Sequence, residues 1–199
     1  QSADANAPGA PADEAEEVDD AGVPVILVTA NKRAQSIQDV PVSVVALQPE
    51  KLEQAGIVST ADLPQLVPGL TFNPAGEAKL NSFNIRGVGT YALTATLESS
   101  VGVAVDGVPL ARVGGSITDM VDVERVEVLK GPQGMLFGKN ATAGLISIVN
   151  RKPEIGVDEG AINIEYGSYN ELNIDGVANV ALGEKAALRV TGWRYGHDG

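Results

Sequence analysis

The sequence predicts an α+β domain, with a small mixed sheet and short helices, followed by a set of long antiparallel β strands. Three observations support this fold class. Short β-branched segments alternate with short helical segments between residues 25 and 150. An Asp-Gly pair separates two apolar segments in the middle of the chain, which is typical of a β-hairpin. From residue 160 onwards, apolar and polar residues alternate over three long runs.

The composition excludes several classes of protein. The chain has 199 residues, of which 44% are hydrophobic, and this is enough to bury a core. It contains no cysteine and a single histidine, which excludes disulfide scaffolds, cysteine-ligated zinc and thiol catalysis. The formal net charge of −12 argues against nucleic acid as a partner, because phosphate binding requires a basic surface.

The acidic charge is concentrated at the start of the chain. Residues 1–24 carry seven acidic residues and no basic residue, within a segment rich in Ala, Pro and Gly. Such a segment has too few apolar side chains to form a core, so we expect a disordered acidic leader. Residues 25–199 then hold 19 acidic and 14 basic residues, which leaves the rest of the chain only moderately acidic.

The first half of the domain is expected to contain two strands and two short helices. Residues 25–30 and 41–47 are rich in β-branched and apolar side chains, which favours extended strands. Residues 49–56 begin with proline and end with glycine, which predicts a short helix between them. A second short helix is predicted after Ser59 or Thr60, since either side chain can cap it.

The second half of the domain is expected to consist mainly of strands. The strongest hairpin signal is Asp106-Gly107, which joins two alternating apolar segments at 101–105 and 108–111. Further strands are predicted at 82–86, 121–130 and 144–150, with a short helical turn at 133–136.

The alternating runs that follow residue 160 have two interpretations. Apolar residues occupy every second position in 162–166, 172–182 and 188–195, with polar residues between most of them. Strands of this length, with one apolar face and one polar face, are typical of outer-membrane β-barrels. A soluble β-meander gives the same alternation, so the pattern alone leaves both architectures open.

The sequence contains no complete catalytic, cofactor-binding or metal-binding motif. The segment around Gly138-Lys139 lacks the residues that a phosphate-binding loop needs, and Gly87-Val88-Gly89 lacks the third glycine of a dinucleotide motif. The chain offers no nucleophile with a neighbouring base, so we do not expect an enzyme. The acidic residues Asp119, Asp122, Glu124 and Glu127 have no calcium-binding spacing, and we interpret them as solvated charge.

Several short motifs occur in a specific order between residues 25 and 153. They are 26–33 (ILVTANKR), 39–44 (DVPVSV), 62–63 (DL), 67–70 (VPGL), 84–87 (NIRG), 105–108 (VDGV), 123–140 (VERVEVLKGPQGMLFGKN) and 144–149 (GLISIV). This succession closely resembles the plug domain of TonB-dependent outer-membrane receptors. The alternating runs after residue 160 resemble the first strands of the barrel in the same family.

The resemblance divides the chain into four parts. These are the leader (1–24), a TonB box region (25–33), the plug domain (34–155) and the first barrel strands (160–199). Barrels of this family have about 22 strands, which need well over 200 residues. We therefore expect the strands to belong to a truncated transmembrane β-barrel, and the chain to be a piece of a longer receptor.

The resemblance also implies a partner-binding segment near the start of the chain. The matching residues are Ile26, Leu27, Val28, Thr29 and Ala30. An extended β-branched segment can add a strand to the sheet edge of a partner, here the TonB C-terminal domain. The alternative is that this segment is simply the first strand of the plug.

The resemblance implies a latch between the plug and its own barrel domain. Arg86 and Lys130 match plug positions whose positive charges face barrel carboxylates in the family, and Glu124, Arg125 and Glu127 belong to the same motif. Hydrated ion pairs of this kind are individually weak, so a pull on the box could open the latch. The alternative is that Arg86 and Lys130 are ordinary surface charges.

The resemblance places the contact with the substrate in the loops at the outer apex of the plug. These loops are expected at 73–82, 88–100 and 113–118, with Asn81, Tyr91 and Thr94 as candidate contacts. The implied substrate is a scarce nutrient, such as an iron–siderophore chelate, and no cofactor is implied.

The implied function is active transport across the outer membrane, energised by TonB, with the plug facing the periplasm. The alternative is a soluble, β-rich periplasmic module for binding or assembly, without transport.

Overall fold

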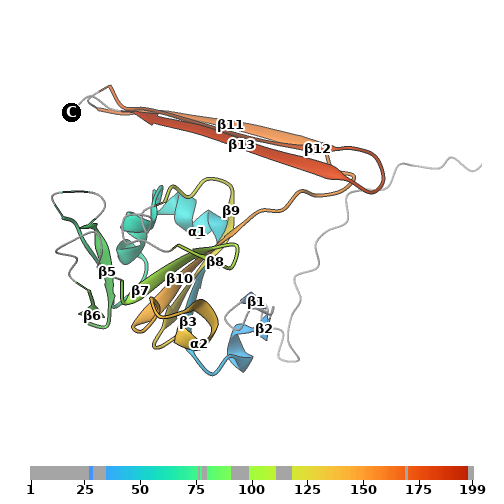
Figure 1. The fold of residues 1–199 in the computed structure, drawn as a ribbon. Coiled ribbons are helices and arrows are strands. Elements are labelled where there is room, and N and C mark those ends of the chain that lie inside the picture. Colours follow the sequence, from blue (N-terminus) through green and yellow to red (C-terminus); the bar gives the residue numbers. More distant parts are fainter. Residues whose placement is uncertain are drawn as a thin grey trace, which may run out of the picture.

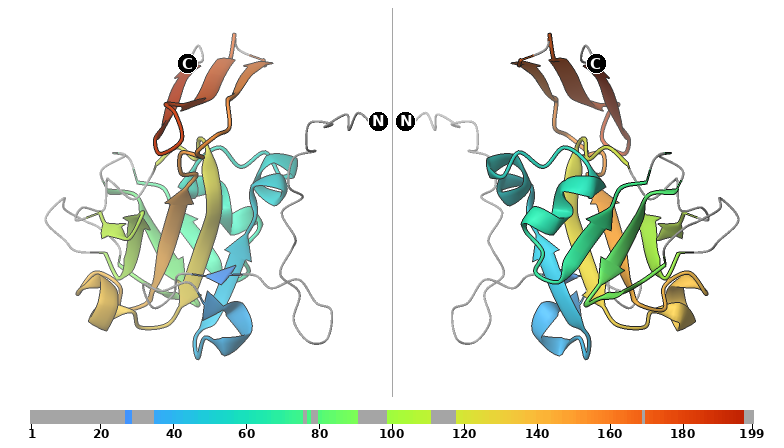
Figure 2. Two further views of the ribbon diagram at one scale, coloured as in Figure 1. Left: turned by 90° about the vertical axis from the view of Figure 1, so that its right-hand side faces the viewer. Right: turned by 90° about the vertical axis from the view of Figure 1, so that its left-hand side faces the viewer.

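The computed structural model describes residues 27–28, 35–75, 77, 80–90, 99–110, 118–168 and 170–196. The predicted leader lies outside the described residues. The described chain forms an α+β domain and a separate sheet of three long strands, referred to here as the terminal sheet (Figure 1). The terminal sheet lies at one end of the α+β domain, and the first two short strands lie at the other end (Figures 1 and 2).

The centre of the domain is a mixed sheet of five strands in the order β3-β9-β10-β7-β8. Strand β10 is parallel to β7, and the other neighbouring pairs are antiparallel. This confirms the predicted mixed sheet. The strands are β3 (Ser43–Leu47), β7 (Val101–Val105), β8 (Val108–Pro109), β9 (Val123–Lys130) and β10 (Gly144–Asn150).

The predicted hairpin is present between β7 and β8. Val105 pairs with Val108, and the two turn residues, Asp106 and Gly107, both have positive φ angles of 49° and 79°. Two left-handed residues are what a two-residue hairpin turn requires, which explains the Asp-Gly sequence. The Asp106 carboxylate also accepts a hydrogen bond from the backbone N–H of Asn150, which fixes the end of β10.

The described helices are short, and three of the four lie where the sequence predicts them. The helix α1 (Pro49–Gln54) begins with proline, and the 3₁₀ helix η2 (Thr60–Gln65) begins after Ser59. The Asp62 carboxylate accepts hydrogen bonds from the backbone and hydroxyl of Ser59, at 3.0 Å each. The remaining helical elements are η1 (Ile37–Asp39) and α2 (Gly134–Phe137).

The five-stranded sheet has a separate apolar cluster on each face. In β9, Val126 and Val128 point into the larger cluster, which also contains Leu52 of α1. Leu129 points to the other face, into a smaller cluster that includes Val28 and Leu145. Both clusters follow from the alternation of side chains along a strand. A second small sheet, made of β4 (Leu70–Asn73), β5 (Ser82–Ile85) and β6 (Val88–Gly89), contributes to the larger cluster.

The terminal sheet consists of β11 (Glu159–Tyr166), β12 (Leu172–Ala181) and β13 (Ala187–Gly196), in antiparallel order. The pairing places Ile162, Ile164, Tyr166 and Val190 on one face, where they are between 56% and 78% exposed. The opposite face carries mainly polar side chains and is directed towards the α+β domain. The predicted antiparallel strands with one apolar face are therefore confirmed.

Of the strand predicted at 25–30, the described residues Leu27–Val28 form β1, which pairs with β2 (Gln35–Ser36), and the other residues of that prediction lie outside the described residues. Two details differ from the expectations. The segment before residue 41, to which we assigned no helix or strand, contains β2 and η1, and it covers the smaller cluster through Ile37 and Val40. The helix after Ser59 is a 3₁₀ helix, and it contains Pro64, which cannot donate a backbone hydrogen bond.

The close approach of β10 to its neighbours can be tested at Gly144. A Cβ atom there would lie 2.5 Å from both the Leu129 carbonyl oxygen and the Ile85 side chain. We expect Gly144→Ala to lower the free energy of unfolding by about 1–3 kcal/mol in urea titrations. Gly134→Ala is the control, because a Cβ at Gly134 meets no atom within 4 Å. Equal stability of the two variants would contradict the packing described.

Candidate functional site

The N-terminal strand β1 is attached to the domain by a small contact. Among the described residues, the ladder consists of two pairs, Leu27 with Ser36 and Val28 with Gln35. Val28 is fully buried in the smaller cluster, together with Leu129 and other apolar residues. Ile26, Thr29 and Ala30 of the predicted partner-binding segment lie outside the described residues.

The burial of Val28 supports the interpretation that this segment is the first strand of the domain. It does not conflict with partner binding, because a ladder of two residue pairs is among the first parts of a fold to open. Partner binding through residues 26–30 remains a prediction.

The charged residues of β9 form ion pairs with one another. Arg125 donates from Nε to Oε1 of Glu127 at 2.8 Å and also contacts Glu124. The Glu127 side chain is fully buried in the sheet, opposite Ala46 and Ser147. A buried carboxylate without a cation would be strongly unfavourable, so Arg125 stabilises Glu127 in this position. Our interpretation of Glu127 as solvated charge was wrong, because a strand pattern does not reveal which face the neighbouring segments cover.

Arg86 and Lys130 lie together at the end of β9 that is remote from the terminal sheet. Lys130 donates from Nζ to the Pro68 carbonyl oxygen at 2.8 Å, and the Arg86 backbone N–H donates to the Gly69 carbonyl oxygen at 2.7 Å. Among the described residues, neither side chain forms an ion pair with a carboxylate of the terminal sheet. Their role as a latch therefore remains a prediction, which concerns parts of a barrel other than these three strands.

Of the predicted substrate contacts, only Asn81 belongs to the described residues. Its side chain is buried, and Oδ1 accepts a hydrogen bond from the Ala75 backbone N–H at 2.6 Å. This bond closes the loop between β4 and β5. Tyr91 and Thr94 lie outside the described residues, so the substrate contacts remain predictions.

The strongest contact between the domain and the terminal sheet was not predicted. Arg189 of β13 binds Asp122 through both nitrogens of one edge of its guanidinium, with two distances of 2.6 Å. A third nitrogen donates to Glu159 at 2.8 Å, and the Thr191 hydroxyl donates to Asp122 at 3.0 Å. The side chains of Arg189 and Asp122 are only 4% and 9% exposed.

A neighbouring bond extends this contact along β13. The Trp193 indole N–H donates to Oδ2 of Asp119 at 2.9 Å. Our interpretation as solvated charge was therefore wrong for Asp122, whereas Asp119 is exposed and accepts this bond at the surface. Asp122 has a positive φ angle of 55°, which Asp adopts more readily than most residues, and this turn precedes β9. The only signal in the sequence was a basic residue, Arg189, at a position of β13 where alternation predicts the polar face.

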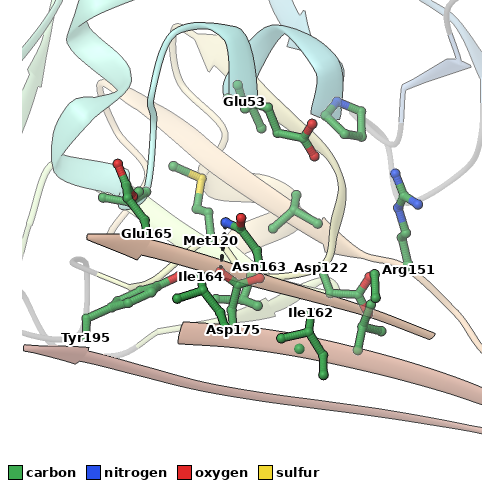
Figure 3. A pocket seen from close by; sticks show the side chains of 18 of the residues that line it. Glu53, Met120, Asp122, Arg151, Ile162, Asn163, Ile164, Glu165, Asp175 and Tyr195 are labelled. Carbon is green, nitrogen blue, oxygen red and sulfur yellow. Dashed lines mark hydrogen bonds between the residues drawn. The ribbon is translucent and has the colours of Figure 1, made fainter. Parts of the chain in front are cut away.

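A cavity of about 960 Å³ lies beside this contact, between the domain and the polar face of the terminal sheet (Figure 3). Glu53 and Met120 line it from the domain. Asn163, Asp175 and Tyr195 line it from the terminal sheet, and Asn163 donates a hydrogen bond to Asp175. Within the described residues, no group of three or more acidic or histidine side chains is arranged to hold a metal ion.

None of the described helices is both long enough and apolar enough to cross a membrane.

The electrostatics of Asp122 favour its ionised form. Burial alone would raise its pKa, but hydrogen bonds from Arg189 and Thr191 and the charges of Arg189 and Arg151 outweigh this effect. The pKa of Asp122 therefore lies below its ordinary value of 3.8.

The sequence matches one family model, described as "TonB-dependent Receptor Plug Domain", over residues 36–145. The chain is 34% identical over 157 residues to the pesticin receptor of Yersinia pestis. It is 31% identical over 134 residues to the vitamin B12 transporter BtuB of Vibrio vulnificus. These alignments cover 76% and 65% of this chain, but only 23% and 21% of the relatives. The chain thus spans about a quarter of the length of the relatives it matches.

Solved structures show the same fold. The ferric yersiniabactin uptake receptor FyuA of Yersinia pestis matches with a TM-score of 0.70 and 29% identity, over 77% of this chain and 24% of that protein. The ferripyoverdine receptor of Pseudomonas aeruginosa also matches with a TM-score of 0.70, over 84% of this chain and 22% of that protein. Its 21% identity makes it a likeness of fold alone.

The contact between Asp122 and Arg189 predicts a pH-dependent stability. Because the pKa of Asp122 is lowered on folding, its contribution is fully present above about pH 4 and is lost as the pH falls through the folded value. We expect Asp122→Asn to lower the free energy of unfolding by about 1–3 kcal/mol near neutral pH. This difference from the wild type should shrink as the pH falls below 3.8 and Asp122 becomes protonated in the folded protein.

Urea titrations of both proteins at several pH values measure this difference. Glu159→Gln is the matched control, because the Glu159 side chain is 47% exposed and binds Arg189 through a single oxygen. A difference between wild type and Asp122→Asn that is the same at low and neutral pH would rule out the ionic contact.

Proposed function

The chain belongs to the family of TonB-dependent receptor plug domains, and from this membership we propose that it forms the plug and the first wall strands of an outer-membrane nutrient receptor. The observation that carries this proposal is the order of the domain and the terminal sheet. The family match covers residues 36–145, and strands with one exposed apolar face follow directly, as the wall of a transmembrane barrel requires.

The proposed activity is active transport, in which the plug gates the uptake of a scarce nutrient. An iron–siderophore chelate is the substrate class best supported, because the similar proteins include an uptake receptor for ferric yersiniabactin. The similarity to a vitamin B12 transporter supports a wider range of nutrients. All these relatives are receptors or transporters, which supports a role without catalysis.

The proposed location is the outer membrane, with the plug open to the periplasm. On the terminal sheet, Ile162, Ile164 and Val190 would face lipid, while Arg189 and Thr191 face the plug. Apolar side chains are unfavourable in water in proportion to their exposed area, so lipid is the favourable neighbour of that face.

The proposed source of energy is TonB, bound through residues 26–30. Strand addition to the TonB C-terminal domain would use the backbone of these residues, so Val28 must first leave the smaller cluster. The small β1–β2 ladder makes this release inexpensive compared with unfolding of the domain.

A soluble periplasmic module is the second candidate, and the burial of Val28 favours it, because a first strand needs no partner. Deletion of residues 25–30 separates the two candidates. If the deleted chain unfolds, the segment is structural, and if it stays folded but no longer binds TonB, the transport function is supported.

The binding mode itself can be tested at Leu27. Proline has no backbone N–H, so Leu27→Pro should weaken binding of the TonB C-terminal domain about tenfold or more, which isothermal titration calorimetry measures. Leu27→Met is the matched control, since it keeps the backbone donor and should bind within about threefold of wild type. Equal affinity of the two variants, or no binding by the unmodified chain, would refute strand addition at this segment.

A further inference from the structure

The segment that precedes β9 is fixed to the interior of the domain through its backbone. The Thr118 carbonyl oxygen accepts a hydrogen bond from Thr60, and the Met120 N–H donates to Val58, at 3.1 and 2.9 Å. These bonds hold the backbone against the start of η2. The side chains of Asp119 and Asp122 are directed the other way, and both bind β13.

The partner residues on β13 follow the period of a strand. Arg189, Thr191 and Trp193 occupy every second position, so all three point from the same face of the terminal sheet. Together they donate four hydrogen bonds to Asp119 and Asp122. The two aspartates with these three β13 residues are referred to here as the clamp.

The connector between β10 and β11 is held close to the clamp. The Arg151 backbone N–H donates to the Asp122 carbonyl oxygen at 3.1 Å. Asn179 of β12 is 1% exposed and donates to the carbonyl oxygens of Glu154 and Val157 at 2.9 and 2.7 Å. The terminal sheet is therefore tied to the domain both by the clamp and by a connector whose backbone is itself fixed.

The clamp and β1 lie at opposite ends of β9. Asp122 directly precedes β9, whereas Val28 packs in the same cluster as Leu129, near the other end of this strand. Seven residues of extended chain span roughly 23 Å. Contacts so far apart, without shared partners, contribute to stability almost independently.

We propose that the clamp positions the plug on its wall and stays closed when β1 leaves the smaller cluster. Arg189 is the positioning residue, because it joins Asp122 of the plug to Glu159 at the start of the first wall strand. The polarity is the reverse of the predicted latch, since here the wall supplies the cation and the plug supplies the carboxylates. The proposal concerns the step after β1 is released, and in that respect it rests on the proposed function.

Trp193 can report by NMR whether the clamp is closed. Trp193 is the only tryptophan, and its indole N–H is one of the clamp's donors. In a ¹⁵N-labelled full chain in detergent micelles, the single indole resonance therefore reports whether the clamp is closed. Asp119→Ala and Arg189→Gln should each move this resonance towards the position of a free indole. Arg194→Gln is the matched control, because Arg194 pairs with Ile174 on the apolar face, and it should leave the resonance in place.

The release of β1 is then imposed in two ways. One is Val28→Asp, which places a charge in the smaller cluster, and the other is deletion of residues 25–30. We expect the Trp193 resonance to keep its wild-type position in both proteins, while backbone resonances of β2 shift. Movement of the indole resonance to the position seen in Arg189→Gln would overturn the proposal.

A variant that does not fold is recognised because its backbone amide resonances lose their chemical-shift dispersion. In that case the test is made on the unmodified chain. Addition of the TonB C-terminal domain should shift the resonances of β1 and leave that of Trp193 unchanged. A shift of both would overturn the proposal. If TonB does not bind, the proposed function fails, but the deletion variant still decides whether the clamp is independent of β1.

The role of Arg189 is separated from general stability by a double-mutant cycle. The indole shifts caused by Arg189→Gln and Asp122→Ala should be non-additive, because each change opens the same contact. Arg189→Lys keeps the charge but loses the two-nitrogen geometry, so it should give an intermediate shift. Additive shifts, or full recovery by lysine, would show that Arg189 does not position the plug through Asp122.

Discussion

The alternation of side chains along β9 is the constraint on which the other contacts of this protein depend. The strand lies between β3 and β10, so both of its backbone edges are paired and its side chains must divide between two faces. Val126 and Val128 fill the larger cluster, while Glu127 and Leu129 face the other side. Asp122 of the clamp directly precedes β9, and Lys130 is the last residue of this strand. The clamp, the buried Glu127, the packing of Val28 beside Leu129 and Lys130 all depend on the register of this one strand.

This arrangement gives the two attachments of the domain different strengths. The clamp combines a two-nitrogen guanidinium–carboxylate pair with further hydrogen bonds in a largely buried place, which is the strong form of an ion pair. The strand β1 is held by two residue pairs and by the burial of Val28. A partner that acts on the N-terminal segment would therefore meet the weaker attachment first, with the stronger one at the far end of β9.

Much of the fold could be predicted because its signals are local. Pro49 at the start of α1, Asp106-Gly107 in the hairpin, and the alternation in β12 each act within a few residues. The charged contacts could not be predicted in the same way. Asp122 and Arg189 are 67 residues apart in sequence, and no local pattern indicates that they meet. Glu127 has the appearance of a solvated charge on an alternating strand, but β3 and β10 on either side and the cover of the smaller cluster bury it.

The sequence by itself determined most of the strands and helices and the apolar face of the terminal sheet, because these depend on periodicity and on turn residues that act locally. Its ordered motifs carried the resemblance to the family. Only the tertiary structure decided which charges are paired and which of the two ends of β9 is tied to the terminal sheet. The physical reason is that the energy of a charge depends on its burial and its partners. Burial and partners are set by segments distant in the chain, as with Asp122 beside Arg189.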